Sequence, residues 1–274
     1  MTTQKEVSVA FSGNIPANYE SFLGPMFFEP FAGDMAGRLR AFRPRSILET
    51  ACGTGRVTRK LPEIIPMEGT ILATDINPAM VAHAQTVSGP DSRIRWEVAD
   101  AVSLPYGDAM FDCVISQFGV MFYSDRPQAS AEAMRVLKPG GVFLFNAWDK
   151  LEHNPAARMT DHTLTRFFPT DTPAFYKVPF SYWDEEQIRQ DLTMAGFGNI
   201  RMEVVSLTGY AGTPEMAAKG LLEGTPVHTA IVERNETLLE PMRRALAEEL
   251  AEMFGHTDLS VPVQARVVLA VKAT

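Results

Sequence analysis

One acidic residue and several small residues that could bind a cation lie close together in the stretch 47–58, which reads I-L-E-T-A-C-G-T-G-R-V-T. An apolar pair is followed by Glu49, and the small residues Ala51, Gly53 and Gly55 then carry the chain through a tight turn. Small residues let a ligand touch the main chain, and the free N–H groups of a following helix would face that ligand. A carboxylate at Glu49 would repel a pyrophosphate and attract an ammonium or sulfonium group. The turn is therefore predicted to bind a cationic ligand.

Two further acids end predicted strands: Asp75 in I-L-A-T-D-I and Asp100 in E-V-A-D-A. In open parallel sheets, ligands bind at the carboxyl ends of the strands, near the point where the strand order reverses. Asp75 can there accept hydrogen bonds from both hydroxyls of a ribose, and Asp100, beside Ala101, from an adenine amino group. Ile76 and Met80 are suited to sandwich the purine. One such acid is typical of a turn or a helix cap, but three in succession indicate a nucleoside with an amino-acid tail.

The elements that must position these residues follow from the alternation of apolar segments. Strands are predicted at 45–50, 70–75, 93–98, 111–117, 141–147, 199–208 and 261–272. Helices between them are predicted to begin at the N-caps Asn77, Asp125 and Asp184, the second ending at Pro139-Gly140-Gly141. This alternation predicts an α/β, Rossmann-like, doubly wound and mostly parallel seven-stranded sheet with helices on both faces.

The composition is that of an ordinary globular protein, with 274 residues, 46% hydrophobic and 21% charged. A net charge of −8 disfavours a nucleic-acid partner. Cys52 and Cys113 lie in predicted core elements, which argues against a disulfide framework. No pattern of Cys or His residues has the spacing of metal ligands, so no metal is expected. Neither a signal peptide nor a span long enough to cross a bilayer is present, which predicts a cytoplasmic protein.

These motifs resemble the class I S-adenosylmethionine (SAM)-dependent methyltransferases, especially the small-molecule group (methyltransferase type 11) that includes the ubiquinone-biosynthesis type. E-T-A-C-G-T-G matches the acid-x-Gly-x-Gly-x-Gly loop of that family, with Ala51 in place of its first Gly. F-D-C-V-I-S-Q-F-G-V-M-F (111–122) followed by R-V-L-K-P-G-G (135–141) is a highly specific match. The resemblance implies that SAM is the cofactor and S-adenosylhomocysteine (SAH) the product. It also implies that Tyr19, Gln117 and Phe118 line the cofactor site.

With this resemblance, the chain is expected to divide into five segments. These are an N-terminal helical segment (1–44), a SAM-binding Rossmann-like core (45–148), an insertion with a helix and the sixth strand (149–212), a helical cap (213–256) and the final strand (257–274). In the first segment, an amphipathic helix is predicted from Phe28 to Phe42, and the stretch around Tyr19 before it is expected to be looser.

The implied reaction is in-line transfer of the SAM methyl group to a small-molecule acceptor, with the protein supplying orientation and exclusion of water. The sequence assigns no catalytic residue and is compatible with a monomer or a homodimer. An apolar acceptor pocket is predicted from Phe167, Phe168, Phe175, Phe180, Tyr182 and Trp183, and the candidates for a general base are Tyr123, His153, His162, Tyr176 and His228.

Two alternatives belong to other functional classes. A SAM-binding sensor or scaffold without catalysis would carry the same motifs. A nicotinamide-dependent oxidoreductase is suggested by Gly53-x-Gly55-x-x-Thr58 with Asp75 downstream. Thr58 in place of the third glycine and Glu49 beside the expected pyrophosphate count against the oxidoreductase, as does the lack of a Tyr-x-x-x-Lys motif.

Overall fold

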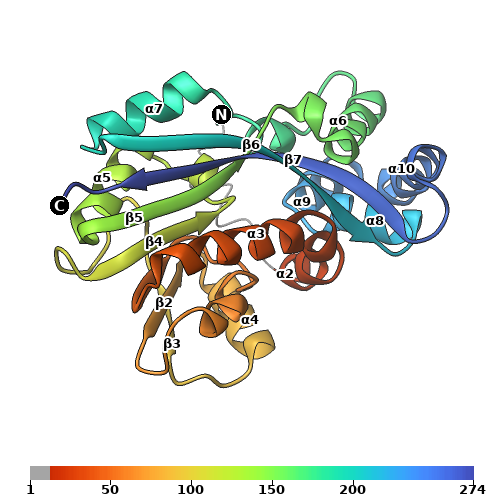
Figure 1. The fold of residues 1–274 in the computed structure, drawn as a ribbon. Helices are drawn as coiled ribbons and strands as arrows, with labels where there is room; N and C mark the ends of the chain where they lie inside the picture. The colour runs from red at the N-terminus through yellow and green to blue at the C-terminus, as the bar shows by residue number, and fades with distance from the viewer. Residues whose placement is uncertain (1–12) are drawn as a thin grey trace.

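A seven-stranded sheet forms the centre of the computed structural model, which describes residues 13–274 (Figure 1). The first twelve residues of the predicted N-terminal segment lie outside the described part of the chain. The strands are β1 (Ser46–Glu49), β2 (Thr70–Asp75), β3 (Ile94–Val98), β4 (Phe111–Gln117), β5 (Leu137–Trp148), β6 (Asn199–Ala211) and β7 (Leu259–Val271). Their order is β3-β2-β1-β4-β5-β7-β6, and β7 runs antiparallel to the other six strands. The predicted fold class is therefore confirmed.

The strand order reverses between β1 and β4. From β1 the chain builds outward through β2 and β3, and it then returns to place β4 on the other side of β1. Glu49, the last residue of β1, lies opposite Ala73 of β2 and Ile115 of β4. The loops after these parallel strands therefore meet at one edge of the sheet, where a ligand crevice is expected.

Helices cover both faces of the sheet and gather at one end of β6 and β7 (Figure 1). The α-helices are α2 (Ile15–Asn18), α3 (Glu29–Leu39), α4 (Pro78–Ser88), α5 (Arg126–Val136), α6 (Pro155–Phe167), α7 (Glu185–Met194), α8 (Pro214–Glu223), α9 (Val227–Asn235) and α10 (Leu239–Phe254). A π-helix, η1 (Tyr19–Phe28), joins α2 to α3. The short 3₁₀ helices are η2 (Arg40–Phe42), η3 (Thr58–Glu63), η4 (Val120–Phe122), η5 (Leu151–His153), η6 (Phe175–Lys177) and η7 (Glu236–Leu238). No helix in the described range 13–274 is long and apolar enough to cross a bilayer.

The three predicted N-caps are confirmed. Asn77 Oδ1 accepts from the Ala79 N–H at 2.9 Å, and Asp125 Oδ1 accepts from the Gln128 N–H at 2.9 Å. Asp184 Oδ1 accepts from the Glu186 N–H at 2.8 Å. Each of these side chains satisfies a backbone donor that has no partner within its helix.

Three local predictions were wrong. The stretch around Tyr19 is helical rather than loose, because Leu23, Met26 and Phe27 of η1 bury their side chains and outweigh the local Gly and Pro. The helix expected after the glycine loop is only the 3₁₀ helix η3, which contains Pro62, a residue without an N–H to continue a helix. Finally, α5 was predicted to end at Pro139-Gly140-Gly141 but ends at Val136, because β5 begins at the next residue.

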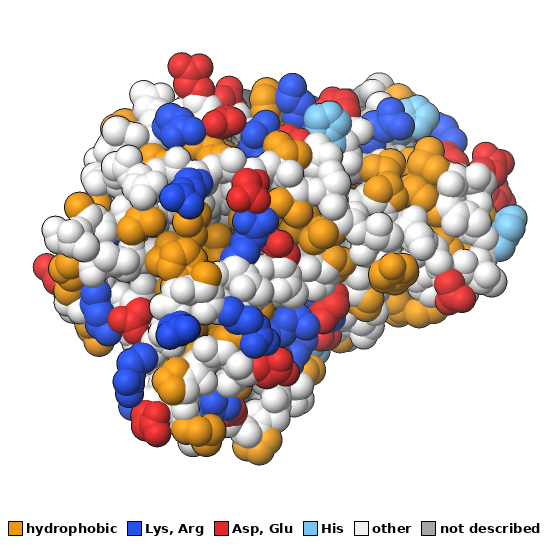
Figure 2. All heavy atoms as spheres, in the orientation of Figure 1, with side chains coloured by type: hydrophobic (Ala, Val, Ile, Leu, Met, Phe, Trp, Pro, Cys, Tyr) orange, Lys and Arg blue, Asp and Glu red, His pale blue; other side chains and the backbone are white. Residues whose placement is uncertain are grey.

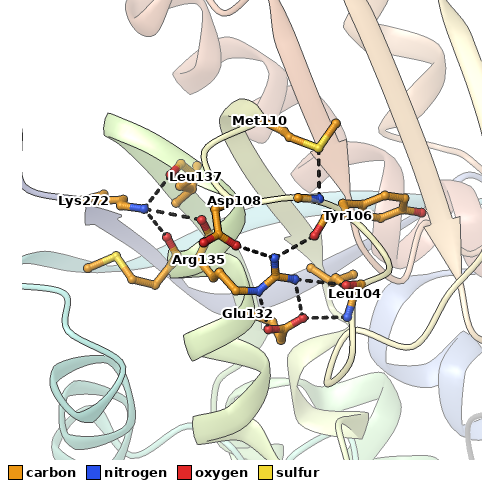
Figure 3. A network of polar contacts seen from close by, with 10 residues as sticks. Leu104, Tyr106, Asp108, Met110, Glu132, Arg135, Leu137 and Lys272 are labelled. Carbon is orange, nitrogen blue, oxygen red and sulfur yellow. Dashed lines mark hydrogen bonds and ion pairs between the residues drawn. The ribbon is translucent and has the colours of Figure 1, made fainter.

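An ion-pair network attaches the loop before β4 to the end of α5 (Figure 3). Arg135 donates to Glu132 Oε1 at 2.8 Å and Asp108 Oδ1 at 2.8 Å, and to the carbonyl oxygens of Leu104 and Tyr106. Lys272 of the C-terminal region donates to the Leu137 carbonyl oxygen at 2.7 Å. Arg135 opens the R-V-L-K-P-G-G motif, so this part of the family pattern has a structural role in the chain.

The two larger clusters of buried residues lie on opposite sides of the sheet. One cluster packs α3 and η3 against Ile47, Ile71 and Cys113. The other joins the opposite face of the sheet to the helical segments after β5 and β6, including Leu221 and Leu246. The helices after β6 therefore share a continuous core with the sheet. On the face shown in Figure 2, basic and acidic side chains are interspersed around α3 and do not form a patch of one sign.

Candidate functional site

A cavity opens at the carboxyl edge of the sheet, where the strand order reverses. It contains about 760 Å³ of space, part of it open to solvent, and we call it the edge cavity. Its lining residues are Tyr19, Ala51, Gly53, Asp75, Ile76, Met80, Ala99, Asp100, Ala101, Gln117, Phe118, Gly119, Phe122, Tyr123 and Ser124. Of the residues that the sequence predicts for the cofactor site, all line this cavity except Glu49 and Gly55.

Asp75 is the buried acid of the edge cavity, with 8% of its surface exposed. Its Oδ2 accepts from the Gly53 N–H at 2.9 Å, and its Oδ1 accepts from the Asn77 N–H at 2.8 Å. Burial raises the pKa of Asp75, while these two N–H groups and that of Ile76 act in the opposite direction. The two backbone donors fix the carboxylate and leave acceptor capacity on both oxygens for a ligand.

Glu49 lies behind the glycine loop and does not line the cavity. It is 1% exposed, and its Oε2 accepts from Thr58 Oγ1 at 2.5 Å. Burial raises the pKa of Glu49 to about 8; Thr58 and Arg59 oppose this shift and Asp75 adds to it. The structure therefore does not support direct contact between Glu49 and a ligand ammonium.

The glycine loop combines ligand access with internal packing. Gly53 has φ +55° and lines the cavity, and a Cβ added there would meet nothing within 4 Å. Gly55 has φ +78°, and an added Cβ would lie 2.7 Å from the ring of Trp96. Gly55 is thus needed for packing against β3, and the prediction that it approaches the ligand is not supported by its position.

Ala51 occupies a position that favours glycine, since its φ is +53°. The space for its side chain exists because residue 119 is a glycine. A Cβ added to Gly119 would lie 2.4 Å from the Ala51 Cβ and 2.7 Å from Ser116 Oγ. The two loops at the ends of β1 and β4 therefore accommodate only one methyl group between them.

We expect Gly119→Ala to lower the free energy of unfolding by about 1–3 kcal/mol, because it overpacks this contact. Adding Ala51→Gly should restore part of the loss, and chemical denaturation of the four combinations measures the coupling. Gly33→Ala in α3 is the matched control, since its added Cβ meets nothing within 4 Å. Strictly additive effects at positions 51 and 119 would contradict the packing account.

The residues predicted to bind adenine also line the edge cavity. Asp100, Ala101, Ile76 and Met80 all line it. Asp100 Oδ1 also accepts from the Val102 N–H at 3.2 Å, as a turn residue does. Asp100 thus has both the structural role that its position alone suggests and a place on the cavity wall.

Gln117 and Tyr123 supply polar groups beside the end of β4. Gln117 Nε2 donates to the Phe28 carbonyl oxygen at 3.1 Å, and its buried Oε1 has no hydrogen-bond partner among residues 13–274. Tyr123 Oη lies 2.8 Å from Ser116 Oγ and 2.9 Å from Thr50 Oγ1, and burial raises its pKa to about 12. Tyr123 therefore stays protonated near neutral pH. The unused acceptor of Gln117 is suited to a ligand N–H.

Tyr19 was predicted to line the cofactor site, but the contacts that hold its helix against the glycine loop were not predicted. Tyr19 lines the cavity, and the adjacent Glu20 accepts from Thr54 Oγ1 at 2.5 Å and from Arg59 at 2.7 Å. Arg56 donates to the Glu20 carbonyl oxygen at 2.6 Å and to the Glu29 carboxylate at 2.9 Å. These contacts attach η1 and α3 to the glycine loop. No local sequence signal pairs residues so far apart in the chain.

A second, apolar cavity adjoins the edge cavity and contains about 550 Å³, part of it open to solvent. Its lining residues are Tyr19, Leu23, Phe27, Phe28, Phe118, Phe122, Trp148, Ala157, Phe175, Tyr176, Pro179, Phe180, Leu221 and Thr225. Tyr19, Phe118 and Phe122 belong to both cavities. The apolar cavity therefore lies against the end of the edge cavity that contains Phe118.

The predicted acceptor aromatics are only partly in this cavity. Phe175 and Phe180 line it, whereas Phe167, Phe168, Tyr182 and Trp183 do not. The Tyr182 hydroxyl instead donates to Asp191 at 2.7 Å. The pattern of aromatic residues identified the correct segment but did not separate lining side chains from ordinary core.

The remaining candidates for a general base are three histidines and Tyr176. His153, His162 and His228 line neither cavity, and His153 Nδ1 lies 2.9 Å from Asp149 Oδ2. Tyr176 lines the apolar cavity, but its hydroxyl donates to the Leu221 carbonyl oxygen at 3.1 Å and burial raises its pKa. None of these groups is placed as a base at neutral pH.

Comparisons with known proteins identify the family of the chain. Residues 48–145 match the family described as a methyltransferase domain. The chain is 33% identical over 168 residues to the ubiquinone/menaquinone biosynthesis C-methyltransferase UbiE of Saccharophagus degradans, a match that covers 57% of this chain and 68% of the relative.

Solved structures share the fold. Phosphoethanolamine N-methyltransferase 2 of Haemonchus contortus, solved with phosphomonomethylethanolamine and SAH, superimposes with a TM-score of 0.58 and 21% identity, covering 94% of this chain and 57% of the other. The [4+2]-cyclase SpnF superimposes with a TM-score of 0.59 and 20% identity, covering 99% and 97%.

Proposed function

Because the chain belongs to the class I SAM-dependent methyltransferases of the ubiquinone-biosynthesis type, we propose that it methylates a small molecule held in the apolar cavity and releases SAH. Membership of this family makes SAM the cofactor. The single observation that carries the proposal is that Tyr19, Phe118 and Phe122 line both cavities. An acceptor in one cavity would then lie beside a cofactor in the other.

The residues of the edge cavity fit the chemistry of SAM. Asp75 would hold the ribose hydroxyls, Asp100 and Ala101 the adenine edge, and Ile76 and Met80 its faces. The buried Gln117 Oε1, which has no partner in the described part of the chain, is an acceptor suited to the ammonium of the amino-acid tail. When bound, SAM supplies a methyl group that its sulfonium has already activated.

The protein's own contribution would be binding, alignment and exclusion of water. Tyr19 and Phe28 stack with ring centroids 4.6 Å apart, and the helix that carries them covers the junction of the two cavities. Since no side chain there is placed as a base, a phenol or an activated carbon of the acceptor would lose its proton to solvent and not to the enzyme.

The nearly all-apolar lining favours a neutral acceptor, and aromatic walls favour a ring. A quinone precursor satisfies both requirements and agrees with the name of the Saccharophagus relative, a ubiquinone/menaquinone biosynthesis C-methyltransferase. The less supported alternative is a SAM-binding protein without methyl transfer. Family membership and the buried Thr58, which donates to Glu49, remove the basis for a nicotinamide oxidoreductase.

The test has two steps. Mass spectrometry of ligand released from freshly purified protein should identify SAM or SAH. SAH release should then be screened over phenols, quinone precursors, amines and fatty acids, and we expect turnover with a neutral aromatic acceptor. Tight SAM binding without SAH release for every acceptor would favour the non-catalytic alternative.

A further inference from the structure

Phe118, which separates the two cavities, has a strained backbone. Its φ is +52°, a left-handed conformation that is rare for a bulky side chain. It directly follows β4, and its side chain is buried between the edge cavity and the apolar cavity. Strain of this kind costs on the order of 1–3 kcal/mol and persists only where the surroundings hold it.

Asn146 of β5 supplies the restraint. The Phe118 N–H donates to Asn146 Oδ1 at 2.9 Å and to the Asn146 carbonyl oxygen at 3.2 Å. Because that N–H is a donor, the amide oxygen of Asn146 must face it, which fixes the orientation of the side chain. Asn146 is 1% exposed and lines neither cavity.

The other half of the Asn146 amide has no evident structural use. Its buried Nδ2 has no hydrogen-bond partner among the described residues. An unsatisfied buried donor is costly, so an apolar side chain would suit the interior of this strand better if stability alone mattered. What the Asn146 side chain contributes is its amide oxygen, which holds Phe118 in position.

The same strand also holds the ring of Phe118. Trp148 lies two residues after Asn146 on β5, and its ring stacks on Phe118 with centroids 3.6 Å apart and an interplanar angle of 8°. Trp148 lines the apolar cavity. One strand thus fixes both the backbone and the ring of the residue between the two ligands.

We propose that Asn146 is a positioning residue for acceptor binding, because its amide oxygen holds Phe118 in the conformation that forms the shared wall. The proposal rests on the proposed function in one respect, namely that the acceptor occupies the apolar cavity. Asn146 acts on the acceptor only through Phe118 and Trp148.

The first experiment follows Trp148 itself. The chain has three tryptophans, and Trp96→Phe with Trp183→Phe leaves Trp148 as the only tryptophan, which is excited selectively over tyrosine. In this background and with SAH present, Asn146→Leu should shift Trp148 emission to longer wavelength and increase its quenching by acrylamide. Asn146→Asp, which keeps an oxygen acceptor, should retain the parent spectrum. An unchanged spectrum in the Asn146→Leu variant would overturn the proposal.

A double-mutant cycle keeps the test decisive if Asn146→Leu alone is too unstable to purify. Phe118→Gly tolerates a positive φ without the restraint. Asn146→Leu should therefore lower the free energy of unfolding less in the Phe118→Gly background than in the parent. If the single variant is too unstable to recover but the double variant folds, that result supports the same conclusion. Equal costs, or a double variant that also fails to fold, would count against the role of Asn146.

The second arm separates this proposal from the proposed function. Calorimetry with 2-naphthol, an uncharged two-ring phenol, probes the apolar cavity of the SAH complex. Asn146→Leu should weaken 2-naphthol binding by roughly tenfold, the effect of losing one well-placed aromatic contact, and change SAH affinity less. Asn146→Asp should bind 2-naphthol about as tightly as the parent. Lack of 2-naphthol binding to the parent would contradict the proposed acceptor site, whereas equal binding to parent and Asn146→Leu would contradict the positioning role.

Discussion

Replacing Asp75 by Ala is expected to weaken SAM binding by about 100-fold or more, since hydrogen bonds to a charged group contribute about 1.5–3 kcal/mol each. The carboxylate is 8% exposed and lines the edge cavity with both oxygens already oriented by backbone donors. No other acidic side chain is held in this way at the ends of β1 and β2. Isothermal calorimetry with SAM measures the effect.

Part of the loss will come from the loop, because Asp75→Ala also leaves the Gly53 and Asn77 N–H groups without their acceptor. Asp112→Ala is the matched control. Asp112 also accepts from two backbone N–H groups, those of Arg45 and Ser46, each at 2.8 Å, but it lies at the opposite edge of the sheet. The control should lose stability and keep its affinity for SAM. Unchanged SAM affinity in Asp75→Ala would remove Asp75 from the cofactor site.

Replacing Glu49 by Gln is expected to stabilise the ligand-free protein at pH 9 by a few kcal/mol, because the variant has no charge to bury there. Near pH 4 the carboxyl is protonated, and we expect the replacement to have little effect on stability. Burial raises the pKa of Glu49 from 4.5 to about 8. Between these two values the unfolded chain has released a proton that the native chain retains, so native stability falls as pH rises through this range. Gln has no such proton and still offers Thr58 an acceptor.

Thermal or urea unfolding from pH 4 to pH 9 measures this difference, with Glu132→Gln as the control. The Arg135 guanidinium lowers the pKa of Glu132, so that carboxylate contributes stability above its unfolded pKa and loses it as pH falls. At high pH, Glu49→Gln should therefore raise the free energy of unfolding and Glu132→Gln should lower it. Parallel stability profiles of wild type and Glu49→Gln would show that Glu49 ionises normally.

The same shift predicts proton release on SAM binding. A cation in the edge cavity favours the ionised form of Glu49 and so lowers its pKa. Calorimetry at pH 7 in two buffers of different ionisation enthalpy should show release of a fraction of a proton by wild type and less by Glu49→Gln. Equal proton release by both proteins would mean that Glu49 does not sense the ligand charge.

The sequence alone determined the sheet, the helix starts and most of the edge cavity. Apolar periodicity and N-caps such as Asn77 and Asp125 are local signals, read within a few residues. The carboxyl ends of parallel strands must meet at one edge, so Asp75 and Asp100 could be assigned to a common site without coordinates.

Only the tertiary structure decided which of these groups face the ligand space. Glu49 turns behind the loop to Thr58, Gly55 packs on Trp96, and the Tyr19 segment folds over both cavities. The Gly55 and Tyr19 outcomes depend on contacts between residues far apart in the chain, and burial in such contacts outweighs local propensity. The apolar cavity depends on them most, since its walls come from η1, β5 and the segments after β4, β5 and β6.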